Sequence, residues 1–332
     1  MTGYDDQLRA IVAAVDVVSN ERAYVTNARG ERREVRVASE RGPFLGLAGA
    51  LYADCYSALP GAAQPPSTTH EAFFAELRAA NPIAPRFEDG WHVVRFDQGG
   101  VVVARNAQQR VVSPAELVAV GAPVASGAPV RIAAMRELIS SPYGHYVICG
   151  RDVHDASTGR QVRFYWSLAP EGAATFLREI GARLERRRIP FQAKVPVRPD
   201  AYARTDAGVL YLGDEDVAAA SDAIAATYRA LRTTLRAAVP LFARELAPGL
   251  AFAESPPTRD SFGMHRCDLI AEGLVWAAER DAEDAGARLT VLRERLTRYG
   301  FDLDAFERNP SSRYPYRLDA IDVIDALGAE AA

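Results

Sequence analysis

Strand-like segments of this chain come in neighbouring pairs with a short turn between them, and this pairing constrains the fold most. Residues 22–26 and 34–38 flank a turn at residues 27–30, and residues 91–96 and 101–105 flank a turn at residues 98–100. A short turn joins antiparallel strands, whereas parallel strands need a long crossover. We therefore predict an α+β fold in which mixed or antiparallel sheet meanders pack with helices, and not a doubly wound sheet.

Helical spacing of apolar residues fills most of the remaining chain. It predicts helices over residues 5–18, 44–58, 69–80, 171–187, 215–236 and 261–278. Ser113 and Glu116 form a capping-box pattern before a short helix. Residues 143–149 and 161–168, with a turn at residues 156–159, predict a second β-rich meander. A joint near residues 121–129 divides the chain into an N-terminal α+β subdomain, residues 1–125, and a C-terminal α+β domain, residues 126–332.

Composition excludes several classes of protein. The 332 residues are 48% hydrophobic and 25% charged, as in packed globular chains. No apolar run approaches the roughly 20 residues that cross a bilayer, and the first segment carries Asp5, Asp6 and Asp16 in place of a basic, signal-like start. We therefore expect a cytoplasmic protein without a membrane partner. The net charge of −4 gives no general attraction to nucleic acid, so none is expected as a partner.

Cysteine usage indicates neither a disulfide framework nor a zinc site. The chain has 3 cysteines, at positions 55, 149 and 267, which are far apart and form no C-x-x-C pair. We expect them to be small buried hydrophobic residues, and we predict no metal and no other cofactor.

Lysine is nearly absent from this chain. Of the 39 lysine and arginine residues, Lys194 is the one lysine, and the other 38 are arginine. Arginine cannot give up its proton in a protein, whereas a buried lysine amine can become a neutral base or nucleophile. Lys194 is therefore a chemical candidate, although one lysine can also survive by chance. Residues 191–197 read as a strand with Phe191, Ala193 and Val195 on one side and Gln192 and Lys194 on the other, so Lys194 projects from a rigid element.

Four motifs in the second half of the chain resemble the HopA-type family, which is named for a type III secretion effector. They are Val162-Arg163-Phe164-Tyr165-Trp166, Ile189-Pro190-Phe191-Gln192-Ala193-Lys194, Tyr202-Ala203-Arg204-Thr205-Asp206-Ala207-Gly208-Val209-Leu210-Tyr211 and Ser261-Phe262-Gly263-Met264-His265-Arg266-Cys267. The resemblance covers about residues 140–280, and the first 120 residues match only in overall layout. Relatives occur as lyases in pathways for ribosomally made peptides, including class V lanthipeptides and thioviridamide-like compounds.

The resemblance implies an activity and its partners. A partner kinase phosphorylates serine or threonine of a precursor peptide, and a chain like this one then eliminates phosphate to leave dehydroalanine or dehydrobutyrine. Such a lyase needs a base for the Cα proton, a group that stabilises the enolate and cations that hold phosphate. We expect Lys194 to be the base, His265 to be the general acid and Tyr211 to donate to the enolate.

Arginines within the motifs are the expected phosphate ligands, because the guanidinium fork matches phosphate oxygens. They are Arg163, Arg204 and Arg266. Asp206 is expected to orient Arg204. Tyr202 is a second candidate for the enolate, and packing is the alternative role of both tyrosines. His145 and His154 are weaker candidates for the acid than His265, whose alternative role is a helix cap or packing. His70 and His92 are expected to be structural.

Other functions fit the sequence less well. Residues 42–49 contain glycines but match neither a Walker loop nor the dinucleotide fingerprint, and no G-x-S-x-G elbow occurs. His265 and Cys267, two apart on a helix, point in different directions and make a poor nucleophile pair. The main alternative is a non-catalytic protein that binds the kinase or the peptide as an assembly factor, and a phosphatase is a third possibility.

Overall fold

The computed structural model describes residues 3–59, 69–121, 123–140, 144–150, 160–258, 260–310 and 312–318. Within this part, helices combine with antiparallel sheets, which confirms the predicted α+β class. The chain divides into two compact units, the first formed by Met1–Asn81 with Ile139–Ala332 and the second by Pro82–Leu138. The sequence predicts a boundary between residues 125 and 126. In the first unit, the N-terminal elements pack with the C-terminal helices.

Seven α-helices are described, and all of them belong to the first unit. They are α1 (Tyr4–Ala14), α2 (Leu45–Leu51), α3 (His70–Ala79), α4 (Ala173–Arg187), α5 (Val217–Leu231), α6 (Phe262–Ala278) and α7 (Ala285–Arg298). The segment after α2 continues as a π-helix, η1 (Tyr52–Tyr56). Each predicted helix of the first unit therefore exists, although α1 ends at Ala14 and the chain continues there as a strand.

A seven-stranded sheet is the centre of the first unit. Its strands lie in the order β14 (Arg244–Ala247), β15 (Leu250–Glu254), β11 (Gln161–Trp166), β13 (Gly208–Gly213), β12 (Gln192–Pro196), β10 (His145–Cys149) and β9 (Glu137–Ser140). Each pairing whose register is described is antiparallel. The predicted meander of residues 143–149 and 161–168 is wrong in its pairing, because β12 and β13 lie between β10 and β11. The predicted turn at residues 156–159 lies outside the described residues.

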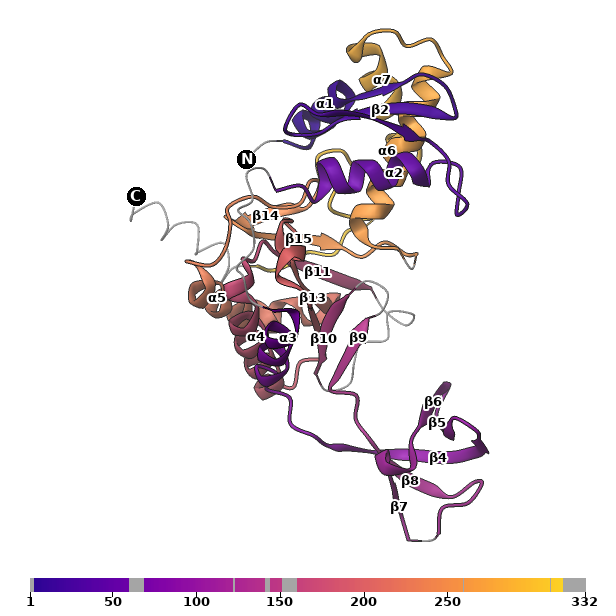
Figure 1. Cartoon of the computed structure of the whole chain (residues 1–332), viewed down its shortest axis with the longest axis vertical. Helices are drawn as coiled ribbons and strands as arrows, with labels where there is room; N and C mark the ends of the chain where they lie inside the picture. Colours follow the sequence, from indigo (N-terminus) through magenta and orange to yellow (C-terminus); the bar gives the residue numbers. More distant parts are fainter. Residues whose placement is uncertain are drawn as a thin grey trace. The chain divides into compact units, whose positions relative to one another are not determined.

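Helices cover this sheet on one face. There α3, α4 and α5 lie together (Figure 1), and the Trp166 and Phe176 rings are 5.2 Å apart. Val162, Phe164 and Leu210 on this face are fully buried. Alternate side chains along each strand point to opposite faces, so the neighbouring residues of β11, β12 and β13 point to the other face, which carries the candidate site.

A second core joins that other face to the ends of the chain. A three-stranded antiparallel sheet, β1 (Val15–Val17), β2 (Arg22–Thr26) and β3 (Arg32–Arg36), shares this core with α1, α2, α6 and α7 (Figure 1). Tyr165 and Val209 of the large sheet belong to the same cluster. Burial of this apolar surface anchors η1 and the start of α6 beside strands β11 and β13.

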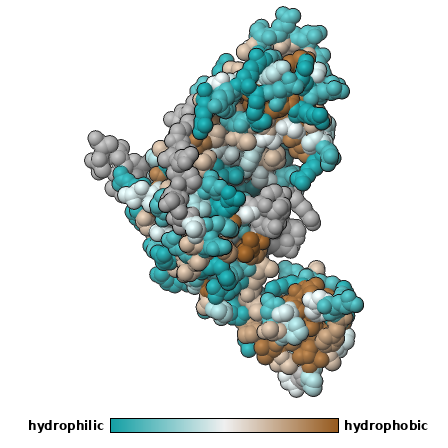
Figure 2. Space-filling view, viewed as in Figure 1, coloured by the Kyte–Doolittle hydropathy of each residue, from teal (hydrophilic) through white to brown (hydrophobic). Residues whose placement is uncertain are grey.

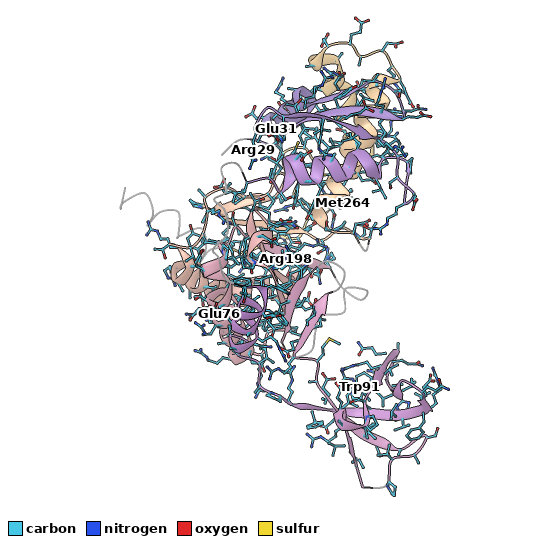
Figure 3. All side chains as sticks on the ribbon, in the orientation of Figure 1. Arg29, Glu31, Glu76, Trp91, Arg198 and Met264 are labelled. Carbon is cyan, nitrogen blue, oxygen red and sulfur yellow. The ribbon has the colours of Figure 1, made fainter. Side chains whose placement is uncertain are left out.

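The second unit is a five-stranded antiparallel sheet. Its strands lie in the order β6 (Gln108–Val112), β5 (Gly100–Arg105), β4 (Phe87–Asp97), β8 (Pro129–Ala133) and β7 (Leu117–Ala119). Trp91 lies among the side chains of this sheet (Figure 3) and is 2% exposed. Figure 2 shows hydrophobic surface on this unit, where Phe96 is 57% exposed.

The predicted capping box in this unit is confirmed, but the short helix that it opens is one 3-10 turn, η2 (Pro114–Glu116). The turn ends at once because β7 begins at Leu117 and pairs with β8. Across the whole described part of the chain, no helix has the length and the apolar character needed to span a bilayer.

Candidate active site

The lone lysine lies on β12, and its strand alternates as the sequence predicts. Ala193 and Val195 are completely buried, whereas Gln192 and Lys194 are only partly buried. Lys194 pairs in register with Val209 of β13 and with Val147 of β10. The side chain therefore projects from a central strand of the sheet. The backbone of Lys194 pairs with a strand on each side.

Tyr211 and Arg163 share this face of the sheet with Lys194. Gln192 of β12 lies opposite Tyr211 of β13, which in turn lies opposite Arg163 of β11. The Lys194 Nζ atom is 5.6 Å from the centroid of the Tyr211 ring, and the Arg163 guanidinium carbon is 5.3 Å from the same centroid. The Tyr211 ring thus lies within the range of cation–π attraction of two positive groups.

These cations act on the acidity of Tyr211. Burial alone would raise its pKa, but the charges of Lys194 and Arg163 and a hydrogen bond with Lys194 outweigh burial, so the pKa of Tyr211 is lowered below its ordinary value. A phenol of increased acidity is a stronger hydrogen-bond donor. Tyr211 is therefore suited to stabilise an oxyanion next to Lys194.

A third cation, Arg204, lies in the loop between η4 (Pro199–Tyr202) and β13. Its Nε atom donates to Asp206 Oδ1, and its Nη2 atom donates to Asp206 Oδ2 at 2.9 Å and to the Tyr52 hydroxyl at 2.7 Å. The Tyr52 hydroxyl donates in turn to Asp206 Oδ2 at 2.8 Å. The prediction that Asp206 orients Arg204 is confirmed. Within the described residues Nη1 has no hydrogen bond, and the Arg204 side chain is 28% exposed, so this edge can accept a ligand.

Asp206 connects Arg204 with Lys194. Burial opposes its ionisation, but Arg204, the hydrogen bond from Tyr52 and the charge of Lys194 together lower the pKa of Asp206 below its ordinary value. The carboxylate is thus ionised and buried between its donors. Tyr52 belongs to the π-helix η1, a type of irregular turn that is frequent at functional sites.

His145 is the titratable group of β10 on this side. Burial and the charges of Lys194 and Arg204 lower its pKa to about 4, against the opposing charge of Asp206. Its imidazole is therefore neutral at neutral pH and lies within electrostatic reach of both cations. The side chain is only partly buried.

Arg163 is held more tightly than Arg204. It is 8% exposed, and it donates from Nε to Ser255 Oγ at 2.9 Å and from Nη2 to the Asp260 carbonyl at 3.1 Å. Ser255 Oγ donates to Gln161 Oε1 at 3.0 Å. With these donors engaged, Arg163 is fixed beside Tyr211, where its charge favours the phenolate.

The motif at the start of α6 forms a separate group. Arg266 is completely buried, with its guanidinium carbon 4.5 to 5.2 Å from the ring centroids of Phe262, Phe301 and Phe306. It donates to the carbonyls of Phe306 and Arg308 at 3.1 and 2.7 Å and to His265 Nδ1 at 2.8 Å. Burial lowers the pKa of Arg266 to about 10. These contacts tie α6 to residues 306–308 and leave Arg266 without solvent access.

Gly263 connects this motif to the site by packing. A Cβ atom at Gly263 would lie 2.3 Å from the Tyr56 ring, so only glycine allows Tyr56 to lie against α6. The Tyr56 and Tyr52 rings stack with centroids 5.2 Å apart. Ser261 caps the helix by accepting from the Met264 amide at 3.1 Å, and Figure 3 labels Met264 on α6. The motif therefore supports Tyr52 indirectly, through the Tyr56 ring that lies between Gly263 and Tyr52.

The structure brings together some of the predicted site residues. Lys194, Tyr211, Arg163 and Arg204 gather around one region of the sheet, and Asp206 joins them. His265 and Arg266 belong to the separate α6 group, which does not favour their predicted roles as acid and phosphate ligand. Tyr202 is fully buried and donates to the Pro196 carbonyl at 2.9 Å, which is a packing role.

Among the other histidines, His70 Nδ1 lies 3.0 Å from the Val197 carbonyl, as expected for a structural residue. His154 lies outside the described residues.

No motif in the sequence indicated Tyr52, and sequence reasoning ranked His145 as a weaker candidate than His265. Tyr52 is 152 positions before Arg204, in the part of the chain where the motifs gave no signal. Within the described chain, no three histidine, cysteine, aspartate or glutamate side chains converge to hold a metal ion. The group as built combines a lysine amine, an acidified phenol, an arginine with a free edge and a neutral imidazole, and this set suits proton abstraction beside an anion.

Comparison with known proteins places these residues in context. We call Lys194, Tyr211, Arg163, Arg204, Asp206, His145 and Tyr52 the Lys194 group. The sequence model of the HopA1 effector protein family matches residues 140–308, which include every member of this group except Tyr52. A search of curated proteins finds no significant match. Two solved structures are similar, those of the effector proteins from Pseudomonas syringae pv. tomato strain DC3000 and pv. syringae strain 61. They are 20% and 15% identical, with TM-scores of 0.48 and 0.46, and each comparison covers 79% of this chain and 88% of the effector.

Proposed function

This chain belongs to the HopA1 effector protein family, and from that premise and the chemistry of the Lys194 group we propose that it is a phosphoserine or phosphothreonine lyase. Its substrate is a ribosomally made precursor peptide that a separate kinase has phosphorylated. The reaction is a β-elimination that leaves dehydroalanine or dehydrobutyrine and releases phosphate.

One observation carries the proposal. The only lysine of the sequence lies on a central strand, with its Nζ atom 5.6 Å from the Tyr211 ring centroid and within electrostatic reach of the buried carboxylate that orients Arg204. An amine can act as a base, whereas an arginine at this position would stay charged. This setting supports a base rather than a surface charge.

The residues divide the reaction among themselves. Lys194 Nζ takes the Cα proton, the Cα–H electrons form the double bond, and the Cβ–oxygen bond to phosphate breaks. Tyr211 donates a hydrogen bond to the adjacent carbonyl oxygen as it becomes an enolate. The free edge of Arg204 binds the phosphate, and Asp206 and Tyr52 keep that guanidinium in place. Arg163 and Arg266 are not needed as direct ligands in this scheme.

A phosphopeptide assay tests the activity. The protein is incubated with synthetic phosphoserine and phosphothreonine peptides in the presence of a chelator, and mass spectrometry follows the loss of phosphoric acid. A thiol added to the product traps the alkene as an adduct. We expect Lys194→Arg, which keeps the charge and removes the base, to lower the turnover by about 10²-fold or more, with the melting temperature unchanged.

Acylation with an amine-selective reagent gives an independent readout, because Lys194 is the only lysine that it can modify. In the wild-type protein, elimination should be lost in proportion to the formation of the lysine adduct. The Lys194→Arg protein should gain only the adduct of the chain terminus. Full activity of Lys194→Arg would reject the mechanism. Release of the free hydroxyl would indicate a phosphatase, and binding without turnover would indicate an assembly factor.

A further inference from the structure

His145 and Lys194 project from the same face of adjacent strands. In the antiparallel pair of β10 and β12, Val147 lies opposite Lys194 and His145 lies opposite Pro196. Opposed residues share a face, and residues two apart on a strand also share it. His145 is therefore the diagonal neighbour of Lys194, at a Cβ separation of roughly 7–8 Å. At this separation the two side chains can contact different atoms of one bound substrate.

The charges around His145 come from two elements. Lys194 of β12 and Arg204 of the loop before β13 are positive, and Asp206 of the same loop is negative. Burial, and then two cations against one carboxylate, keep the imidazole neutral in the free protein. A phosphate dianion bound at Arg204 would reverse this balance and favour a protonated imidazole.

We propose that His145 is the general acid of the reaction and donates a proton to the oxygen that leaves with the phosphate. This inference rests on the proposed lyase function and assigns to His145 the role that the sequence suggested for His265. The Cα proton passes to Lys194 Nζ, the Cβ–oxygen bond breaks, and the imidazolium proton passes to that oxygen. Hydrogen phosphate leaves, and the ammonium and the neutral imidazole that remain are reset by proton exchange with solvent.

His265 lacks the contacts that this role requires. Its Nδ1 atom accepts a hydrogen bond from Arg266 Nη1 at 2.8 Å, and its ring lies 6.4 Å from the Phe301 ring. Protonation at Nδ1 would place a second positive donor against a guanidinium that is completely buried. His265 thus resembles His145 in residue type and in partial burial, but not in its neighbours, which makes it a matched control.

Leaving-group chemistry separates the acid from the base. A peptide with phosphoserine is compared with the same peptide carrying β-chloroalanine at that position, since chloride leaves without a proton. We expect His145→Gln to lower kcat/KM for the phosphopeptide by about 10²-fold and to leave elimination of chloride within about threefold. Lys194→Arg should lose both reactions, because both need removal of the Cα proton. His265→Gln should keep both.

Added imidazole provides a second readout that a structural role would not move. It should restore elimination of phosphate to His145→Ala in proportion to its protonated form. Phosphate elimination within threefold of the wild type in both His145 variants, or parallel loss of both reactions without rescue, would overturn the assignment. If the wild-type protein eliminates neither leaving group, the lyase function itself fails and the role of His145 fails with it.

Discussion

Two arginine-centred groups lie on the same side of the large sheet and differ in what their cations can reach. Arg204 is held by a carboxylate and a phenol, and one edge of its guanidinium remains free within the described residues. Arg266 has no solvent access and donates to two backbone carbonyls. The first arrangement leaves a charge available to a ligand, whereas the second uses the charge to join two segments of backbone. The contacts of an arginine, and not its position in a motif, therefore determine whether its charge is available to a ligand.

The largest expected effect concerns the buried member of this comparison. Arg266→Met keeps the contacts with the phenylalanine rings but leaves the carbonyls of Phe306 and Arg308 without their donor. Each buried unsatisfied group costs about 1–3 kcal/mol, so we expect the free energy of unfolding to fall by about 3 kcal/mol. Turnover per folded molecule should stay within about twofold. Denaturant unfolding and active-site-normalised turnover measure the two quantities.

A loss of turnover in Arg266→Met that exceeds the loss of folded protein would break the comparison. It would bring Arg266 back as a phosphate ligand. Arg280→Met serves as the control for the substitution itself, because Arg280 is a second arginine that stacks on an aromatic ring, Trp276, but at an exposed position. That variant should change the free energy of unfolding by no more than about 1 kcal/mol.

The next effect concerns the exposed member. The double variant Arg204→Gln with Asp206→Asn removes both charges and so avoids a buried carboxylate without its partner. We expect kcat/KM for phosphopeptides to fall by about 10²-fold, or about 2.7 kcal/mol, mainly through KM. The fall in the free energy of unfolding should be the smaller effect. A KM within threefold of the wild type would remove Arg204 from the phosphate site.

The features of the fold and the site that depend on local sequence patterns could be predicted from the sequence. Alternation of Ala193, Lys194 and Val195 predicted which side of β12 carries the lysine, and helical spacing predicted α4 and α6. The scarcity of lysine singled out Lys194 without any structure. Asp206, two positions from Arg204, was assigned correctly to it because the tie is short in sequence.

The rest depends on contacts between distant segments, which local patterns do not specify. Tyr52 meets Arg204 across 152 positions, and the order of the large sheet places β12 and β13 between β10 and β11. That order brings His145 beside Lys194. Conversely, Arg266 and Arg204 both lie in motifs, and the contacts of Arg266 with the carbonyls of residues 306 and 308, 40 or more positions away, distinguish the two arginines.

The smallest effect uses the two histidines as a pH probe of the two groups. Burial lowers the pKa of both His145 and His265 to about 4, with Lys194 and Arg204 adding to the effect at the first and Arg266 at the second. The unfolded chain binds these protons near pH 6.5, so between about pH 6.5 and 4 it holds more protons than the folded chain. The free energy of unfolding is therefore unaffected above pH 6.5 and falls as the pH drops toward 4.

We expect His145→Gln and His265→Gln each to reduce this fall by about 1 kcal/mol, allowing for their partial exposure. Urea unfolding across this range measures the fall. Only His145→Gln should also change the pH dependence of phosphopeptide turnover, and an equal change in His265→Gln would mean that the α6 group takes part in the chemistry after all.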